Sequence, residues 1–246
     1  MSKKPVLLVI AHGSRDPRHA ATVHALVRRV RALRPDVRVE TGFLDFNIPS
    51  VQGVLESLAA QGVRDVVALP LLLTRAFHAK ADIPAVLRDA PPQLRIRQAE
   101  VLGPSPLLMA ALERRLYEAG LTPADKPSTG VVLASAGSTD PEAIAVIAEI
   151  AREWRLTGWC AVRPAFASAS LPRTEDAVRE LRELGCERVA VAPYVLAPGF
   201  LPDRIARGAA EADVLADVLG AAPEVARVLL ERYEAARVPV LAAVGA

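Results

Sequence analysis

The chain has 246 residues, 52% of them hydrophobic and 24% charged, and its formal net charge is +2 at pH 7. A chain of this length can form two compact domains or one large one. Its basic residues are interleaved with acidic ones, which argues against nucleic acid as the main partner. No apolar stretch approaches the roughly 18 residues of a membrane span, and the first apolar run is too short for a signal peptide, so we expect no membrane partner.

The two cysteines, Cys160 and Cys186, have neither the spacing of metal ligands nor that of a redox motif. We therefore expect a free thiol at each position, which is typical of a reducing cytoplasm.

A short buried strand followed by a turn opens the chain. The apolar run Val6–Ala11 predicts a strand that is covered on both faces, as in a parallel sheet. Gly13 allows a sharp turn, and Asp16 can cap a helix that begins at Pro17. His12 is therefore expected at the carboxyl end of the first strand, which is where open α/β sheets bind ligands.

Strands and helices alternate through the first half of the chain. Apolar spacing predicts helices over 17–33, 49–62 and 106–120, a short helix from Ile83, and strands over 37–44, 66–69 and 94–101. This order is typical of a parallel sheet built from right-handed crossovers.

The same order then repeats. Residues 121–128 are polar, contain two prolines and predict a linker, after which 131–141 matches the opening stretch. From Phe43 to Phe77 the first half matches the second at a constant shift without a gap. We therefore predict two tandem three-layer α/β domains, 1–122 and 129–246, each with a four-stranded parallel sheet flanked by helices and related by internal duplication.

Comparison of the two repeats shows which residues the fold itself does not require. Turn and cap residues recur, but three polar residues of the first half are lost in the second: His12 becomes Ala136, Asp45 becomes Ser168 and His78 becomes Leu201. Each of the three follows a different predicted strand, so they can converge above one edge of the first sheet. The second copy would then keep the fold but not the site.

Two imidazoles and a carboxylate can act in two ways. They are suitable ligands for Fe²⁺, Co²⁺, Ni²⁺ or Zn²⁺, and the imidazoles are suited to acid–base chemistry near neutral pH. Ser14 also lies beside His12, but Ser138 persists in the copy without the histidine, so we interpret Ser14 mainly as a turn or capping residue. His19 and His24 are interpreted as solvated or partly packed residues of the helix over 17–33, without a role.

Three segments, in this order, resemble the motifs of one protein family: 11–17, 43–50 and 70–84. The family is that of the sirohydrochlorin chelatases, which insert a divalent metal into an early tetrapyrrole, and the resemblance spans the chain in its long, two-domain form. One departure is Asp45, where the family has glutamate. The shorter side chain leaves open whether it ligates the metal directly or through water.

The resemblance implies a substrate, sirohydrochlorin, bound between the two domains, with the metal as second substrate and no prosthetic group. It implies that His12 and His78 are catalytic and, with Asp45, hold the metal. The acetate and propionate arms of the substrate call for polar and cationic contacts. The candidates are Ser14, Arg15, Arg75, Lys80 and, from the second domain, Arg204.

Several alternatives remain at this stage. Iron is the favoured metal, which would place the protein in sirohaem synthesis, and cobalt would place it in anaerobic cobalamin synthesis. A histidine phosphatase would need an arginine beside the histidine to hold phosphate, and that neighbour is Ala11. A non-enzymatic metal or tetrapyrrole carrier could use the same residues. Internal duplication makes a monomer the simplest expectation.

Overall fold

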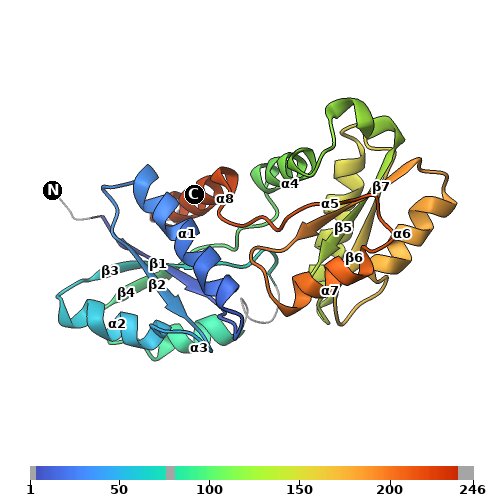
Figure 1. Cartoon of the computed structure of the whole chain (residues 1–246). Helices are drawn as coiled ribbons and strands as arrows, with labels where there is room; N and C mark the ends of the chain where they lie inside the picture. The colour runs from blue at the N-terminus through green and yellow to red at the C-terminus, as the bar shows by residue number, and fades with distance from the viewer. Residues whose placement is uncertain (1–3, 76–80, 238–246) are drawn as a thin grey trace, which may run out of the picture.

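The structure, a computed structural model, describes residues 4–75 and 81–237 and contains two parallel sheets (Figure 1). The first has the order β2-β1-β3-β4 and the second β6-β5-β7-β8. The strands of the first are β1 (Val6–Ala11), β2 (Val39–Phe43), β3 (Asp65–Pro70) and β4 (Arg95–Gln98). Those of the second are β5 (Thr129–Ser135), β6 (Ala161–Phe166), β7 (Arg188–Tyr194) and β8 (Val214–Leu215). The predicted fold class is confirmed.

Helices cover both faces of each sheet. They are α1 (Pro17–Leu33), α2 (Val51–Ala60), α3 (Ile83–Arg88), α4 (Pro106–Glu118), α5 (Pro141–Arg155), α6 (Thr174–Glu183), α7 (Phe200–Gly208) and α8 (Pro223–Arg237). The outer face of the first sheet packs against α2 and α3, and that of the second against α6 and α7. Among the described residues, no helix is both long and apolar enough to cross a membrane.

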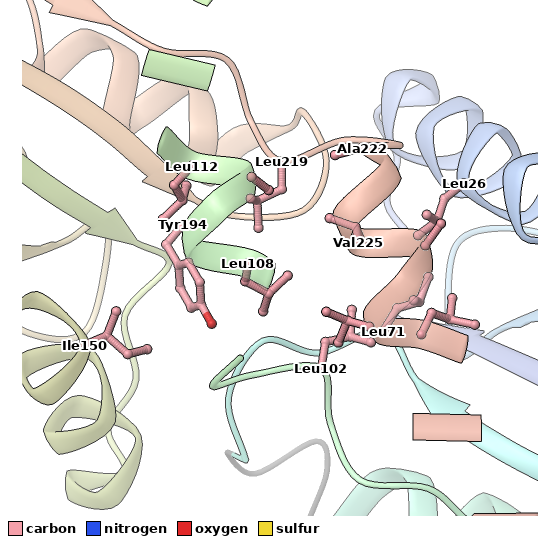
Figure 2. Close-up of a cluster of buried hydrophobic side chains, with 14 of the residues drawn as sticks. Leu26, Leu71, Leu102, Leu108, Leu112, Ile150, Tyr194, Leu219, Ala222 and Val225 are labelled. Carbon is pink, nitrogen blue, oxygen red and sulfur yellow. The ribbon is translucent and has the colours of Figure 1, made fainter. Parts of the chain in front are cut away.

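The final helix of each half packs on the sheet of the other half. Helix α4 lies against β7, whereas α8 lies against α1, β3 and β4, and the two helices contact each other (Figure 1). One continuous apolar core therefore runs through both halves, including Leu102, Leu108, Tyr194 and Val225 (Figure 2). The linker lies between the two sheets in the sequence, but the apolar core that includes these residues is shared by both halves.

Polar contacts support this exchange. The Arg114 guanidinium of α4 donates to both carboxylate oxygens of Glu224 in α8, at 3.1 and 3.0 Å. Arg232 of α8 donates to the carbonyl oxygens of Val101 and Leu102, at 2.9 and 3.1 Å, where the chain leaves the first sheet.

The segment 121–128, predicted as a linker without apolar periodicity, contains a 3₁₀ helix, η2 (Pro123–Ser128). The Asp125 carboxylate accepts hydrogen bonds from the backbone and the hydroxyl of Thr122, both at 2.7 Å, and pairs with Arg188 at 2.9 Å. These local polar contacts fix a turn that has no apolar periodicity to reveal it.

Both cysteines are free thiols, as expected, but the fold brings them together. The sulfur atoms of Cys160 and Cys186 lie 3.6 Å apart, just before β6 and β7. Burial, more than the neighbouring thiol, raises the pKa of Cys186 to about 11, so this thiol stays protonated at neutral pH.

The turn after the first strand of each half has the same backbone in both. Gly13 has φ +95° and its equivalent, Gly137, has φ +91°. A Cβ on Gly13 would lie 1.8 Å from the carbonyl oxygen of Asp45, and one on Gly137 would lie 2.0 Å from that of Ser168. Glycine is required here by both the backbone angle and the close approach of the next strand end.

Helix α1 and its equivalent α5 begin in the same way. The carboxylate of Asp16 accepts from the backbone N–H of Arg18 at 2.9 Å, and that of Asp140 accepts from Glu142 at 3.0 Å. Proline occupies the first turn of both helices. These predicted caps are confirmed, and they hold the strand-end loops in place.

We predict that Glu224→Gln destabilises the protein by about 1 kcal/mol at pH 7, because it weakens a bidentate ion pair between the exchanged helices. The hydrogen bond from Arg114 lowers the pKa of Glu224. The stability that the Arg114–Glu224 ion pair contributes is therefore present above the unfolded-state pKa of about 4.3. It is lost as the pH falls through the lowered folded-state pKa. Thermal unfolding of both proteins at pH 7 and at lower pH would show the difference shrinking in acid.

Glu149→Gln is the matched control, because Glu149 pairs with Arg152 on the exposed surface of α5. We expect almost no change from this substitution. Equal effects of the two substitutions would contradict a role for Glu224 in joining the halves.

We predict that Gly13→Ala destabilises the protein by about 3 kcal/mol or more, because the new methyl group would strike the Asp45 backbone. Gly62→Ala is the control, since Gly62 has φ +76° but nothing within 4 Å of the added Cβ. That substitution carries only the left-handed backbone cost of about 1–2 kcal/mol. Chemical denaturation compares the two, and an equal loss would refute the steric argument.

Candidate active site

A cavity of about 310 Å³ lies between the two halves, at the carboxyl ends of their central strands. In the first half it is lined by Ala11, His12, His19, Val23 and 71–74, and in the second by 135–138, Ala143, Ile144, Ile147, Phe166, 194–197, Leu201 and Pro202. Many of these are equivalent positions of the repeat, such as Val23 and Ile147. The duplication therefore builds one shared cavity from two copies of the same segments.

His12 follows β1 and lies in the wall of this cavity. Its ring Nδ1 lies 3.3 Å from the carbonyl oxygen of Gly13. The equivalent loop of the second half keeps its backbone with Ala136 in this place: Asp45 N–H donates to His12 O at 2.9 Å, and Ser168 N–H donates to Ala136 O at 3.0 Å. The imidazole is therefore not needed to form the loop, as the repeat comparison predicted.

Asp45 is next to His12 in space, because their backbones are hydrogen-bonded across the ends of β1 and β2. Its side chain is exposed, and its Oδ1 accepts from the Phe46 N–H at 2.8 Å. It is not among the described residues that line the cavity. The fold thus brings the backbones of two of the three predicted ligands together, with the carboxylate outside the cavity wall.

His78 and Lys80 lie outside the described residues. The described residues Leu71, Leu72, Leu73 and Thr74, earlier in the sequence, line the cavity. Within residues 4–75 and 81–237, no three histidine, cysteine or acidic side chains gather closely enough to hold a metal.

The predicted substrate-binding residues that the structure describes are not part of the cavity lining. Arg15 is exposed, with its guanidinium 5.1 Å from the centre of the Phe46 ring, and Arg75 pairs with Glu100 at 3.8 Å. Arg204 is an exposed residue of α7. Such positions suit contacts with parts of a ligand that extend beyond the cavity.

Ser14 has the structural role interpreted from the sequence. Its hydroxyl accepts a hydrogen bond from the Asp16 N–H at 3.0 Å, and Ser138 accepts from Asp140 N–H at the same distance. The Ser14 N–H also donates to the Asn47 side-chain oxygen at 2.8 Å. This serine holds the turn that carries His12.

His19 was interpreted as a residue without a role, but the structure places it in the cavity wall. Its Nδ1 is buried without a hydrogen-bond partner in the described part of the chain. Burial first, and then the nearby His12, lowers its pKa, so the neutral ring is favoured. The repeat comparison carried the signal, because the equivalent residue is Ala143, which lines the same cavity.

An ion pair joins the two halves close to the cavity. The Arg18 guanidinium of α1 lies 2.7 Å from the carboxylate of Asp203 in α7, and it also pairs with Asp16. His19, next to Arg18, and Pro202, next to Asp203, both line the cavity. Both partners are about half exposed, so the pair contributes little stability but marks where the halves meet.

Comparison with known proteins agrees with this arrangement. The chain is 30% identical over 206 residues to a sirohydrochlorin cobaltochelatase of Priestia megaterium, a match that covers 81% of this chain and 66% of that protein. It is 28% identical over 210 residues to a sirohydrochlorin ferrochelatase of Bacillus subtilis strain 168, covering 83% and 78%. A structure of SirB from Bacillus subtilis with Fe³⁺ superposes with a TM-score of 0.81 at 26% identity, covering 95% and 96% of the two chains.

The model of the CbiX family matches twice, at residues 6–119 and 130–236. These ranges contain both sheets and all the segments that line the cavity, and they span most of the chain. The chain therefore belongs to the CbiX family.

Proposed function

We propose that this protein is a sirohydrochlorin chelatase, a lyase-class enzyme that inserts Fe²⁺ or Co²⁺ into sirohydrochlorin. The observation that carries the proposal is the position of His12 in the wall of a cavity between two halves, in a chain whose relatives are named as such chelatases. Because those relatives include both a cobaltochelatase and a ferrochelatase, they support either metal. Iron stays the favoured choice, and both metals are substrates here, with no prosthetic group proposed.

The cavity suits a large, mostly apolar ligand with a polar reaction centre. Apolar side chains such as Leu71, Ile144 and Leu196 supply much of its wall, which favours burial of a flat macrocycle. Closing both halves over the ligand excludes water from the site. A metal ion that has lost its water shell then binds protein and substrate nitrogens more strongly.

His12 and His78 are proposed to act on the metal and on the protons that it replaces. Insertion forms four bonds from macrocycle nitrogens to the metal and releases two pyrrole protons. A neutral imidazole has one nitrogen lone pair, which can hold the incoming metal or accept one such proton. Asp45, beside His12 in the backbone, is proposed to balance charge directly or through water.

The carboxylate arms of the substrate are proposed to contact Arg15, Arg75, Lys80 and Arg204. Ser14 is proposed to hold the turn that carries His12 and Arg15. The three described arginines are exposed, so these contacts would be made beyond the cavity wall. Exposed charge pairs are individually weak, and their use would be to orient the substrate. We further propose residues 1–122 and 129–246 as the two repeat units, and a monomer in a cytoplasmic setting.

We predict that His12→Ala and His78→Ala each reduce metal insertion at least 100-fold, since each removes a proposed ligand or proton acceptor. The fold is expected to persist for His12→Ala, because the second half forms the same loop with Ala136. Absorbance of sirohydrochlorin with Fe²⁺, Co²⁺ or Ni²⁺, tested side by side, measures insertion and selects the metal. Circular dichroism measures folding.

His24→Ala is the control, because His24 lies on α1 with its ring against Phe43 and is not among the described residues of the cavity wall. It should insert metal at the normal rate. Near-normal turnover by His12→Ala would refute the assignment. Stoichiometric binding without release of metallated product by the unsubstituted protein would instead show a carrier.

A further inference from the structure

Tyr194 is the last residue of β7. Its hydroxyl group is buried and has no hydrogen-bond partner among the described residues. The residue is 2% exposed, and it lines the cavity between the halves. Figure 2 shows its ring extending from the strand end, with the hydroxyl oxygen at the far tip. A buried hydroxyl without a partner is unfavourable, so its presence requires a reason.

The fold does not supply that reason. The equivalent residue of the first half is Leu71, which also lines the cavity without any polar group. The backbone positions correspond, since Leu71 directly follows Pro70 and Tyr194 directly follows the equivalent Pro193. An apolar side chain therefore satisfies this position where only packing is needed.

A second hydroxyl has been gained beside it. Ser135, at the end of β5, is the register partner of Tyr194, is 5% exposed and lines the cavity. Its equivalent in the first half is Ala11. The half that lacks the imidazoles thus carries hydroxyl-bearing side chains at two paired strand positions, where the other half has an alanine and a leucine.

The surroundings indicate what the Tyr194 hydroxyl can bind. Burial raises the pKa of Tyr194 above its usual range, so the group stays protonated and can donate a hydrogen bond. No arginine or lysine is found among the described residues that line the cavity. Neutral hydroxyls are therefore the side-chain donors that the described residues of this wall offer to an acidic group that enters the cavity.

We propose that the Tyr194 hydroxyl, with Ser135 beside it, donates a hydrogen bond to a carboxylate arm of the bound tetrapyrrole. This inference rests on the proposed function, which gives the ligand its acetate and propionate arms. Because the carboxylate arms surround the edge of the macrocycle, some of them must enter the cavity when the macrocycle binds between the two halves. Tyr194 then positions the macrocycle from the second half while His12 acts from the first.

The test is Tyr194→Phe, which removes only the hydroxyl. We expect the dissociation constant for sirohydrochlorin without metal to rise about three- to tenfold, the usual effect of one hydrogen bond. The melting temperature of the free protein should stay the same or rise, because an unpartnered buried hydroxyl is removed. The KM for sirohydrochlorin in metal insertion should rise in the same direction. Ser135→Ala should raise the dissociation constant in the same direction.

Tyr233→Phe is the matched control, since this fully buried tyrosine of α8 donates to the carbonyl oxygen of Pro5 at 2.8 Å. It should lower the melting temperature and leave sirohydrochlorin binding unchanged.

An unchanged dissociation constant in Tyr194→Phe would overturn the inference and leave the proposed function intact. A lower melting temperature in that variant would also overturn it, by showing that the hydroxyl serves the free fold. A loss of kcat without a change in binding would exclude a contact that only positions an arm. If the unsubstituted protein does not bind sirohydrochlorin, the proposed function fails, and this inference fails with it.

Discussion

The exchange of α4 and α8 between the two halves is the constraint on which the rest of the structure depends. The inner face of the first sheet, which includes Leu7 and Val9, is covered by α1 from its own half and α8 from the other. The second sheet uses α4 in the same way. Separating the halves would expose both inner faces to water, so burial of apolar surface holds the two strand ends on either side of one cavity.

This constraint explains how a duplicated chain comes to have a single site. Equivalent segments meet around the cavity, so the backbone is nearly symmetric while the side chains are free to differ. The turn of Gly13 and that of Gly137 have the same geometry, although one carries His12 and the other Ala136. Because glycine and the aspartate caps hold the loops, chemical groups can be lost from one copy without loss of the fold.

Much of the fold and part of the site could be predicted from the sequence. Local rules sufficed for the strand at Val6–Ala11, the caps at Asp16 and Asp140 and the parallel sheets, since those depend on neighbouring residues. The helix exchange could not be predicted in this way. The apolar stripe of α4 shows that one face is buried, but the stripe is the same whichever sheet covers it.

The site shows the same limit. His12 was predicted as a site residue because it follows a strand and is replaced by alanine in the second copy. His19 was not predicted, although it too is replaced by alanine, at Ala143. It lies within a helix, where an imidazole is usually a surface residue, and only the packing of α1 beside the cavity reveals otherwise. The exposed positions of Arg15 and Arg75 depend on loop conformation, which residue type does not determine. That of Arg204 depends on which face of α7 is covered.

The asymmetry of the cavity has a chemical consequence. Among the described residues, His12 and His19 line the cavity from the first half and their equivalents Ala136 and Ala143 line it from the second, so the imidazole nitrogens come from one half only. A flat macrocycle between the walls would meet the metal on one face, while the other face packs against uncharged side chains. Imidazoles on both walls would offer a metal two sites across the same ligand, and ions bound in both would repel each other in a medium of low dielectric constant. Loss of the second set therefore favours a single position for the metal, which is what insertion into one macrocycle requires.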